Sequence, residues 1–200
     1  RGPEPKRSLE LVRSLNSTVI KGNADEWVVR GVKSGEVPQK DLSMMNIERD
    51  WTFSKLLKSD LDYLESLPTQ FNLEIEGVEI FGFHATPNSL FEVIPHDVEN
   101  KIIEEKIVKA NDAQIYVYAH IHKPFIRYLD GKVIMNIGSV GLPFDGMAKA
   151  SYGLIEIEAD NINTTIQRVT YDVEQVISLY QESDYPNKEI MRDIIKRGKL

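Results

Sequence analysis

Two closely spaced histidines are the clearest chemical signal in the chain. His120 and His122 end the apolar run 114–119, with the spacing i, i+2. On an extended strand such residues point to the same face, so both imidazoles are expected to face one point. Neutral imidazole is the commonest metal ligand in proteins. Alone, a His-x-His pair is more often just two polar residues on a half-exposed strand, so a metal site needs further ligands.

Asn23 and His84 are the candidates for those further ligands. Each follows a predicted strand, Asn23 after 17–21 and His84 after 78–83. An amide oxygen combined with imidazoles suits Mn, Fe, Ni or Zn better than Ca or Mg. The chain contains no Cys, which excludes disulfides and thiolate ligands. The residue types therefore predict a metal site built from Asn23, His84, His120 and His122.

The elements that position these residues are read from hydrophobic spacing. Predicted helices repeat apolar residues at i, i+3 or i+4, and predicted strands are β-branched or alternate apolar and polar residues. Helices are predicted over 6–15, 27–32, 98–110, 173–180 and 188–197, and two more within 46–67. Strands are predicted over 17–21, 71–76, 78–83, 114–119, 125–129, 132–136, 151–158 and 164–170. This mixture indicates an α/β (α+β) protein.

Composition narrows the class of protein. With 200 residues, 42% hydrophobic and 28% charged, the chain is predicted to form a single domain over 1–200 with a full core. A net charge of −7 argues against broad nucleic-acid binding, which needs a basic field. There is no run of about 18 apolar residues, so no membrane segment is expected. No stretch resembles a signal peptide, and a cytoplasmic location is predicted.

Four ordered motifs carry a resemblance to a known family. They are Gly-Asn-x-Asp at 22–25, Gly-x-His at 82–84, His-x-His-x-Pro at 120–124 and Asn-x-Gly-Ser-Val-Gly at 136–141. In this order they resemble the calcineurin-like metallophosphoesterase superfamily, and most of all its small prokaryotic phosphodiesterase branch. The resemblance covers the whole chain. It implies a two-layer β-sandwich flanked by helices, with a two-metal site at the strand ends.

The resemblance also implies roles for the candidate residues. Asn23, His84 and His120 would bind one divalent metal ion, manganese before iron, nickel or zinc, and His122 would bind a second. The implied activity is hydrolysis of phosphodiesters or activated phosphomonoesters by a metal-bound hydroxide. The expected partner is a small phosphorylated substrate, and a homo-oligomer is compatible with this prediction.

Two departures from the family pattern matter. Upstream of Gly2-Pro3 the family has Asp-x-His and Gly-Asp motifs, which supply further metal ligands, and this chain shows neither. We therefore expect an N-terminally incomplete member without its first β-α-β unit, with one bound metal or none. Ala24 also stands where many relatives have a His thought to protonate the leaving oxygen. An alternative function is a catalytically idle scaffold that binds a partner protein or a nucleotide.

Overall fold

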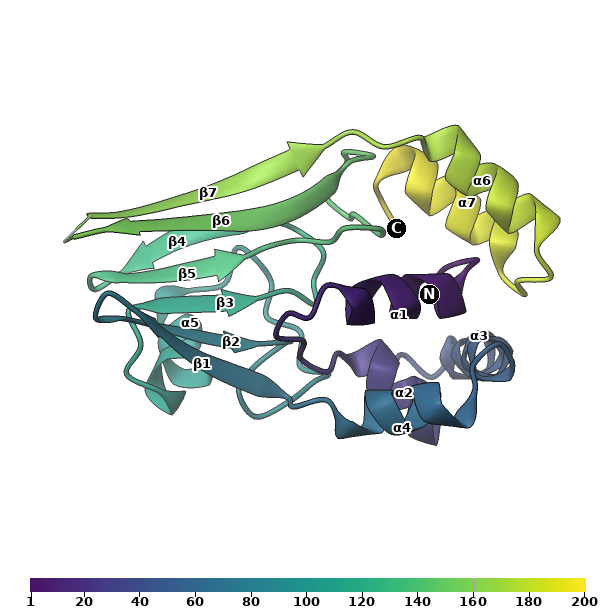
Figure 1. Cartoon of the computed structure of the whole chain (residues 1–200), viewed down its shortest axis with the longest axis horizontal. Helices are drawn as coiled ribbons and strands as arrows, with labels where there is room; N and C mark the ends of the chain where they lie inside the picture. Colours follow the sequence, from purple (N-terminus) through teal and green to yellow (C-terminus); the bar gives the residue numbers. More distant parts are fainter. Residues whose placement is uncertain (160) are drawn as a thin grey trace.

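A computed structural model describes residues 1–159 and 161–200. Its main sheet is mixed and has the strand order β1-β2-β3-β5-β4 (Figure 1). The strands are β1 (Gln70–Ile75), β2 (Val78–Phe83), β3 (Ile115–Tyr118), β4 (Phe125–Leu129) and β5 (Lys132–Asn136). The central strands β2, β3 and β5 run parallel, so their carboxyl ends meet at one edge of the sheet. The candidate residues His84, His120 and His122 follow two of these ends.

A second, antiparallel sheet covers one face of the main sheet. It pairs β6 (Ala150–Glu158) with β7 (Asn161–Val169). Half-buried apolar residues of this hairpin, such as Ile155 and Ile162, pack against the buried Ile80 and Ile115 of the main sheet. Along β6 the exposed Tyr152 and Leu154 alternate with inward-facing residues, as expected of a sheet with one buried face. The predicted two-layer β-sandwich is confirmed.

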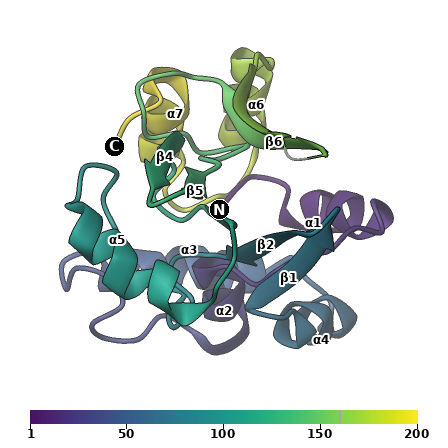
Figure 2. The same ribbon diagram turned by 90° about the vertical axis from the view of Figure 1, so that its left-hand side faces the viewer.

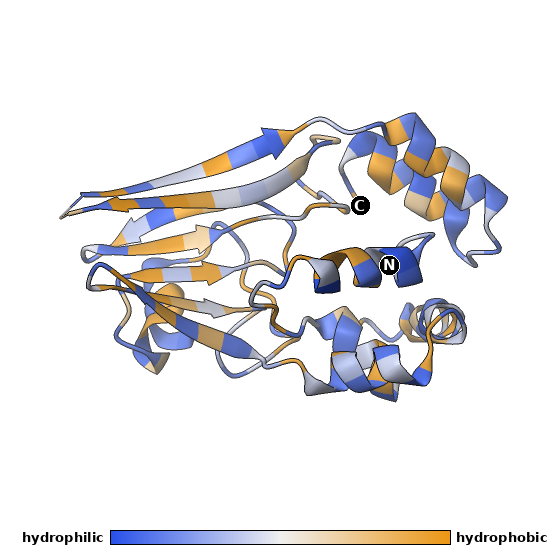
Figure 3. Cartoon of the chain, viewed as in Figure 1, coloured by the Kyte–Doolittle hydropathy of each residue, from blue (hydrophilic) through white to orange (hydrophobic). Residues whose placement is uncertain are grey.

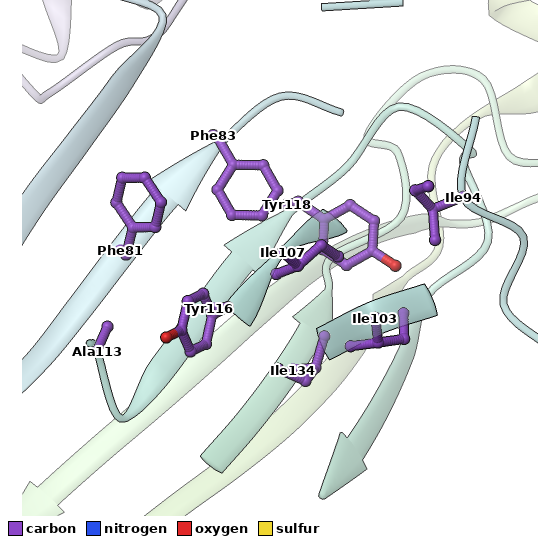
Figure 4. Close-up of a cluster of buried hydrophobic side chains, with 9 residues drawn as sticks. All are labelled: Phe81, Phe83, Ile94, Ile103, Ile107, Ala113, Tyr116, Tyr118 and Ile134. Carbon is purple, nitrogen blue, oxygen red and sulfur yellow. The ribbon is translucent and has the colours of Figure 1, made fainter. Parts of the chain in front are cut away.

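The other face of the main sheet is covered by α5 (Asn100–Lys106). Figure 4 shows its Ile103, with Ile107 just after the helix, against the aromatic side chains of β2 and β3. Phe83 and Tyr118 stack there with ring centroids 5.7 Å apart. In Figure 2, α5 lies outside the sheet on the opposite side from β6. Packing on both faces makes the central strands a rigid support for the loops that follow them.

The remaining helices gather at the end of the sheets where β3 and β5 finish (Figure 1). They are α1 (Pro5–Ser14), α2 (Asn23–Arg30), α3 (Leu42–Ser54), α4 (Lys58–Ser66), α6 (Val173–Glu182) and α7 (Lys188–Arg197). Figure 3 shows apolar and polar residues alternating along α6 and α7, whose buried Tyr180 and Ile194 belong to one cluster. None of the helices within 1–159 and 161–200 is both long and apolar enough to span a membrane.

The predicted elements agree with the structure except in a few places. The predicted strand 17–21 is wrong, because none of its residues pairs in a sheet and only the Lys21 N–H is bonded, to the Pro68 carbonyl at 2.7 Å. β-branched residues favour strands, but a strand forms only against a partner backbone. The predicted helix 98–110 is divided into α5 and a 3-10 turn, Val108–Ala110. The helix predicted over 27–32 begins earlier, at Asn23.

Candidate metal centre

Asn23 and His84 are brought together by a helix start and a strand end. Asn23 is the first residue of α2, where the Asp25 carboxylate accepts the Gly22 N–H at 2.7 Å. His84 directly follows β2. A Cβ at Gly22 would lie 3.1 Å from two atoms of the His84 ring. Glycine therefore lets the imidazole approach the start of α2, and Asp25 caps this helix.

Three polar atoms converge at this point. His84 Nε2 lies 2.8 Å from Asn23 Oδ1 and 3.1 Å from His120 Nδ1. Two ligand atoms bonded at right angles to one cation at about 2.1 Å would be about 3.0 Å apart. A single proton on His84 Nε2 can serve its two neighbours only as a shared, bifurcated donor. A divalent cation would be bound by all three atoms, so the residues present fit the metal that their types predicted.

The backbone around the two loop histidines is unusual. Both His120 and His122 have φ of +57°, in the left-handed region that non-glycine residues rarely adopt. The Ile121 N–H donates to the Ala119 carbonyl at 2.7 Å and closes a tight turn around His120. Because β3 ends at Tyr118, the expectation that His120 and His122 lie on an extended strand is wrong. The turn, and not the strand pleat, directs His120 to His84.

His122 has separate surroundings. Its Nδ1 donates to the Leu142 carbonyl at 2.6 Å, and its ring stacks on Phe144 with centroids 4.8 Å apart. The Ser139 hydroxyl in turn accepts the Leu142 N–H at 3.0 Å. This fixes the tautomer of His122 and leaves Nε2 as the nitrogen that can bind a metal. Sequence reasoning did not find Leu142 and Phe144, since neither residue type signals a role in a metal site.

The loop after β5 holds the histidine loop in place. The buried Asn136 donates from Nδ2 to the Ala119 carbonyl at 2.5 Å, and its Oδ1 accepts the Gly138 N–H at 3.0 Å. Gly138 has φ of +73°, and a Cβ there would lie 2.2 Å from the Ser151 hydroxyl oxygen. The Asn-x-Gly part of the motif therefore supports the backbone next to His120.

Burial keeps the imidazoles neutral. It lowers the pKa of His84 to about 3, with further contributions from the positive charges that His120 and His122 would carry. Burial lowers the pKa of His122 to about 4, against the opposing hydrogen bond to Leu142. The pKa of His120 is also lowered by burial, with a hydrogen bond to the backbone of Phe91 acting in the opposite direction. At neutral pH all three rings present lone pairs, as a metal site requires.

The structure thus unites three of the four predicted ligands. Asn23, His84 and His120 form one set, whereas His122 lies beside it with its own hydrogen bond. Within residues 1–159 and 161–200, no group of three His, Cys, Asp or Glu side chains is arranged to hold a metal ion. The Asn23 amide is therefore essential to a three-ligand set.

Comparison with known proteins identifies the family. The calcineurin-like phosphoesterase superfamily domain matches residues 3–160. The chain belongs to this superfamily. The metallophosphoesterase from Sphaerobacter thermophilus has a similar structure, with 25% identity, a TM-score of 0.76, and coverage of 98% of this chain and 83% of that chain.

Two archaeal proteins are also similar. The hypothetical protein PH1004 from Pyrococcus horikoshii OT3 has a TM-score of 0.81 at 22% identity, covering 100% of this chain and 82% of that one. The uncharacterized protein MJ0912 of Methanocaldococcus jannaschii is 29% identical over 191 residues, which cover 87% of this chain and 73% of its own length. The family match over residues 3–160 confirms the predicted family, and the structural similarities confirm the predicted fold. Membership of the superfamily indicates metal-dependent hydrolysis of phosphoesters.

Proposed function

We propose that this protein hydrolyses phosphodiesters or activated phosphomonoesters with a divalent metal held by Asn23, His84 and His120. The observation that supports it is the convergence of Asn23 Oδ1, His84 Nε2 and His120 Nδ1, with separations of 2.8 and 3.1 Å. These atoms come from three separate segments that the rigid sheet and α2 hold together. Metal binding through His122 Nε2 is part of the same proposal.

The chain's own residues prepare the site for this chemistry. A bound divalent ion would supply Lewis acidity and lower the pKa of water. The buried, neutral imidazoles and the uncharged Asn23 amide leave the positive charge of the ion uncompensated by the three ligands, which strengthens its effect. The mixed nitrogen and oxygen ligands suit manganese, iron, nickel or zinc, and the resemblance to the superfamily puts manganese first.

Ala24 limits which esters can react. It follows Asn23 in the first turn of α2, and its methyl group cannot donate a proton to a leaving oxygen. Without a general acid, hydrolysis favours leaving groups that are already weakly basic. Activated aryl esters and diesters with acidic leaving alcohols meet this condition. The proposed substrates are therefore small esters of this kind.

Hydrolysis of chromogenic esters tests the proposal. The full chain, stripped with EDTA and reloaded with Mn²⁺, should hydrolyse bis(p-nitrophenyl) phosphate. His84→Gln and Asn23→Ala should lower metal affinity or activity by at least about 10- to 100-fold, as expected of changes at a metal site. Asn72→Ala, at an exposed position on β1, is the matched control and should retain activity. No turnover with Mn²⁺, Fe²⁺, Ni²⁺ or Zn²⁺ would refute the proposed function.

A further inference from the structure

A groove of about 880 Å³ opens directly beside His120. Its walls include the apolar side chains of Val93, Ile121 and Phe144. Val93 is 61% exposed although it is apolar, and Phe144 is the residue on which His122 stacks. A groove that begins at a metal ligand and has apolar walls can take the organic part of a substrate whose phosphorus lies at the metal.

The far end of the chain forms one side of this groove. Gly198 caps α7 with φ of +62°, and its carbonyl accepts the Gly146 N–H at 2.8 Å. A Cβ at Gly198 would lie 2.7 Å from backbone atoms of Met147, so only glycine permits this close approach. Figure 1 shows the segment after α7 turning back toward the loops at the ends of the strands. Lys199, which follows Gly198, therefore lines the groove together with Lys123, one residue after His122.

The charged side chains of the groove favour an anion. Neither Lys123 nor Lys199 forms an ion pair within the described part of the chain. The acidic lining residue Asp145 is already paired with Arg168. Two ammonium groups thus remain to attract negative charge next to the candidate metal centre. Both line a mainly apolar groove, a combination that matches an organic phosphoester better than inorganic phosphate.

We propose that this groove binds the organic group of an anionic phosphodiester, and that Lys123 and Lys199 select against substrates with a cationic group. The proposal rests on the proposed hydrolysis at the Asn23, His84 and His120 site. The occupant is an apolar, planar group such as an aryl ring, held along Val93, Ile121 and Phe144. Lys123 and Lys199 act on specificity and not on the reacting atoms.

Two esters that share a leaving group but differ in charge show whether the lysines select substrates by charge, because the bond that is broken is the same in both. Bis(p-nitrophenyl) phosphate carries one negative charge, whereas p-nitrophenyl phosphorylcholine adds a cationic group, and both release p-nitrophenolate. The Mn²⁺-loaded protein should prefer the first ester in kcat/KM. Lys123→Ala and Lys199→Ala should each raise KM for this ester by about threefold, the effect of one exposed charge pair, and leave kcat unchanged.

The ratio between the two esters is the decisive readout. In the double variant the preference for bis(p-nitrophenyl) phosphate should fall by about tenfold, because two lysines that each repel the choline group by about threefold are lost, whereas attraction to the phosphate is common to both esters and cancels in the ratio. A merely structural role would change both esters equally. Lys40→Ala is the control, since Lys40 is exposed and lies outside the groove. An unchanged ratio in the double variant, with hydrolysis intact, would overturn the groove proposal and leave the proposed function standing.

Binding to metal-free protein gives a test that does not depend on turnover. By calorimetry, phenylphosphonate should bind more tightly than methylphosphonate, because only its ring buries apolar surface. The double lysine variant should weaken phenylphosphonate binding and Lys40→Ala should not. Equal affinity for both phosphonates, or no binding of either, would overturn the proposal. Lysine-dependent binding of phenylphosphonate without hydrolysis of any ester would support the groove and refute the proposed function.

Discussion

Mild acid should destabilise the metal-free protein through its buried histidines. Burial lowers the pKa of His84 to about 3 and of His122 to about 4, whereas both titrate near 6.5 in an unfolded chain. Between these values the unfolded state binds more protons than the folded state. The free energy of unfolding therefore falls as the pH falls below about 6.5, and it is unaffected by these groups at higher pH.

The size of the effect follows from the same pKa values. At pH 5 a histidine that titrates near 6.5 when unfolded and stays neutral when folded costs about 2 kcal/mol of stability. His84 and His122 together should cost about 4 kcal/mol between pH 8 and pH 5. This is a large share of the roughly 5–15 kcal/mol by which domains are stable.

Urea unfolding in EDTA at pH 8 and pH 5 measures this cost. His84→Gln should remove about 2 kcal/mol of the loss, because the amide cannot take up a proton in this range. His96→Gln is the matched control, since His96 is exposed and should leave the loss unchanged. A loss below about 1 kcal/mol in the unaltered chain, or an equal loss in His84→Gln, would refute the inference that burial holds these rings neutral.

Three further substitutions test the geometry of the site and its support. Gly22→Ala should displace the His84 ring, because the added Cβ would lie 3.1 Å from it. We expect Mn²⁺ affinity, measured by equilibrium dialysis, to fall by about tenfold. An unchanged affinity would contradict the inference that only glycine lets the ring come this close. In metal-free protein, the His120→Gly variant should be about 1 kcal/mol more stable in urea unfolding than the His120→Ala variant. The reason is that glycine, unlike alanine, adopts φ of +57° without strain. Equal stability of the two variants would show that the backbone at position 120 is not strained. Gly198→Ala, at φ of +62° and 2.7 Å from Met147, should cost about 1–3 kcal/mol and lower Tm, and an unchanged Tm would show that the segment after α7 is not held as described.

The hairpins of the main sheet could be predicted because their turns have local signatures. In the turn between β4 and β5, Asp130 and Gly131 have φ of +48° and +78°. Positive φ at both central positions is the signature of the turn that an Asp-Gly pair favours. Gly77 marks the turn between β1 and β2 in the same way, with φ of +79°. Each of these features depends on neighbours in sequence, so the sequence alone was enough.

The histidine loop could not be predicted in the same way. The residue types indicated a metal site, but the direction of His120 depends on a positive φ that nothing in a histidine signals. That conformation is supported by Asn136, which lies 17 residues from Ala119, and by the Leu142 carbonyl, 20 residues from His122. The prediction of a strand over 17–21 was wrong for a related reason, since pairing in a sheet depends on backbone that is distant in sequence. Contacts far apart in sequence decided the cases where the prediction was wrong.

The features that make the candidate site costly to fold are also those that suit it to a metal. Burial makes the imidazoles resist protonation, and two histidines have strained backbone. In the metal-free protein these features only reduce stability. A divalent ion binds the same lone pairs that protons would occupy, so binding should offset the cost and raise the free energy of unfolding with metal concentration. Because the folded-state pKa values lie near 3 and 4, Mn²⁺ should still bind at pH 5, where histidines of ordinary pKa would be mostly protonated. If Mn²⁺ raises the urea midpoint at pH 8 but not at pH 5, protons reach the rings more easily than their burial implies.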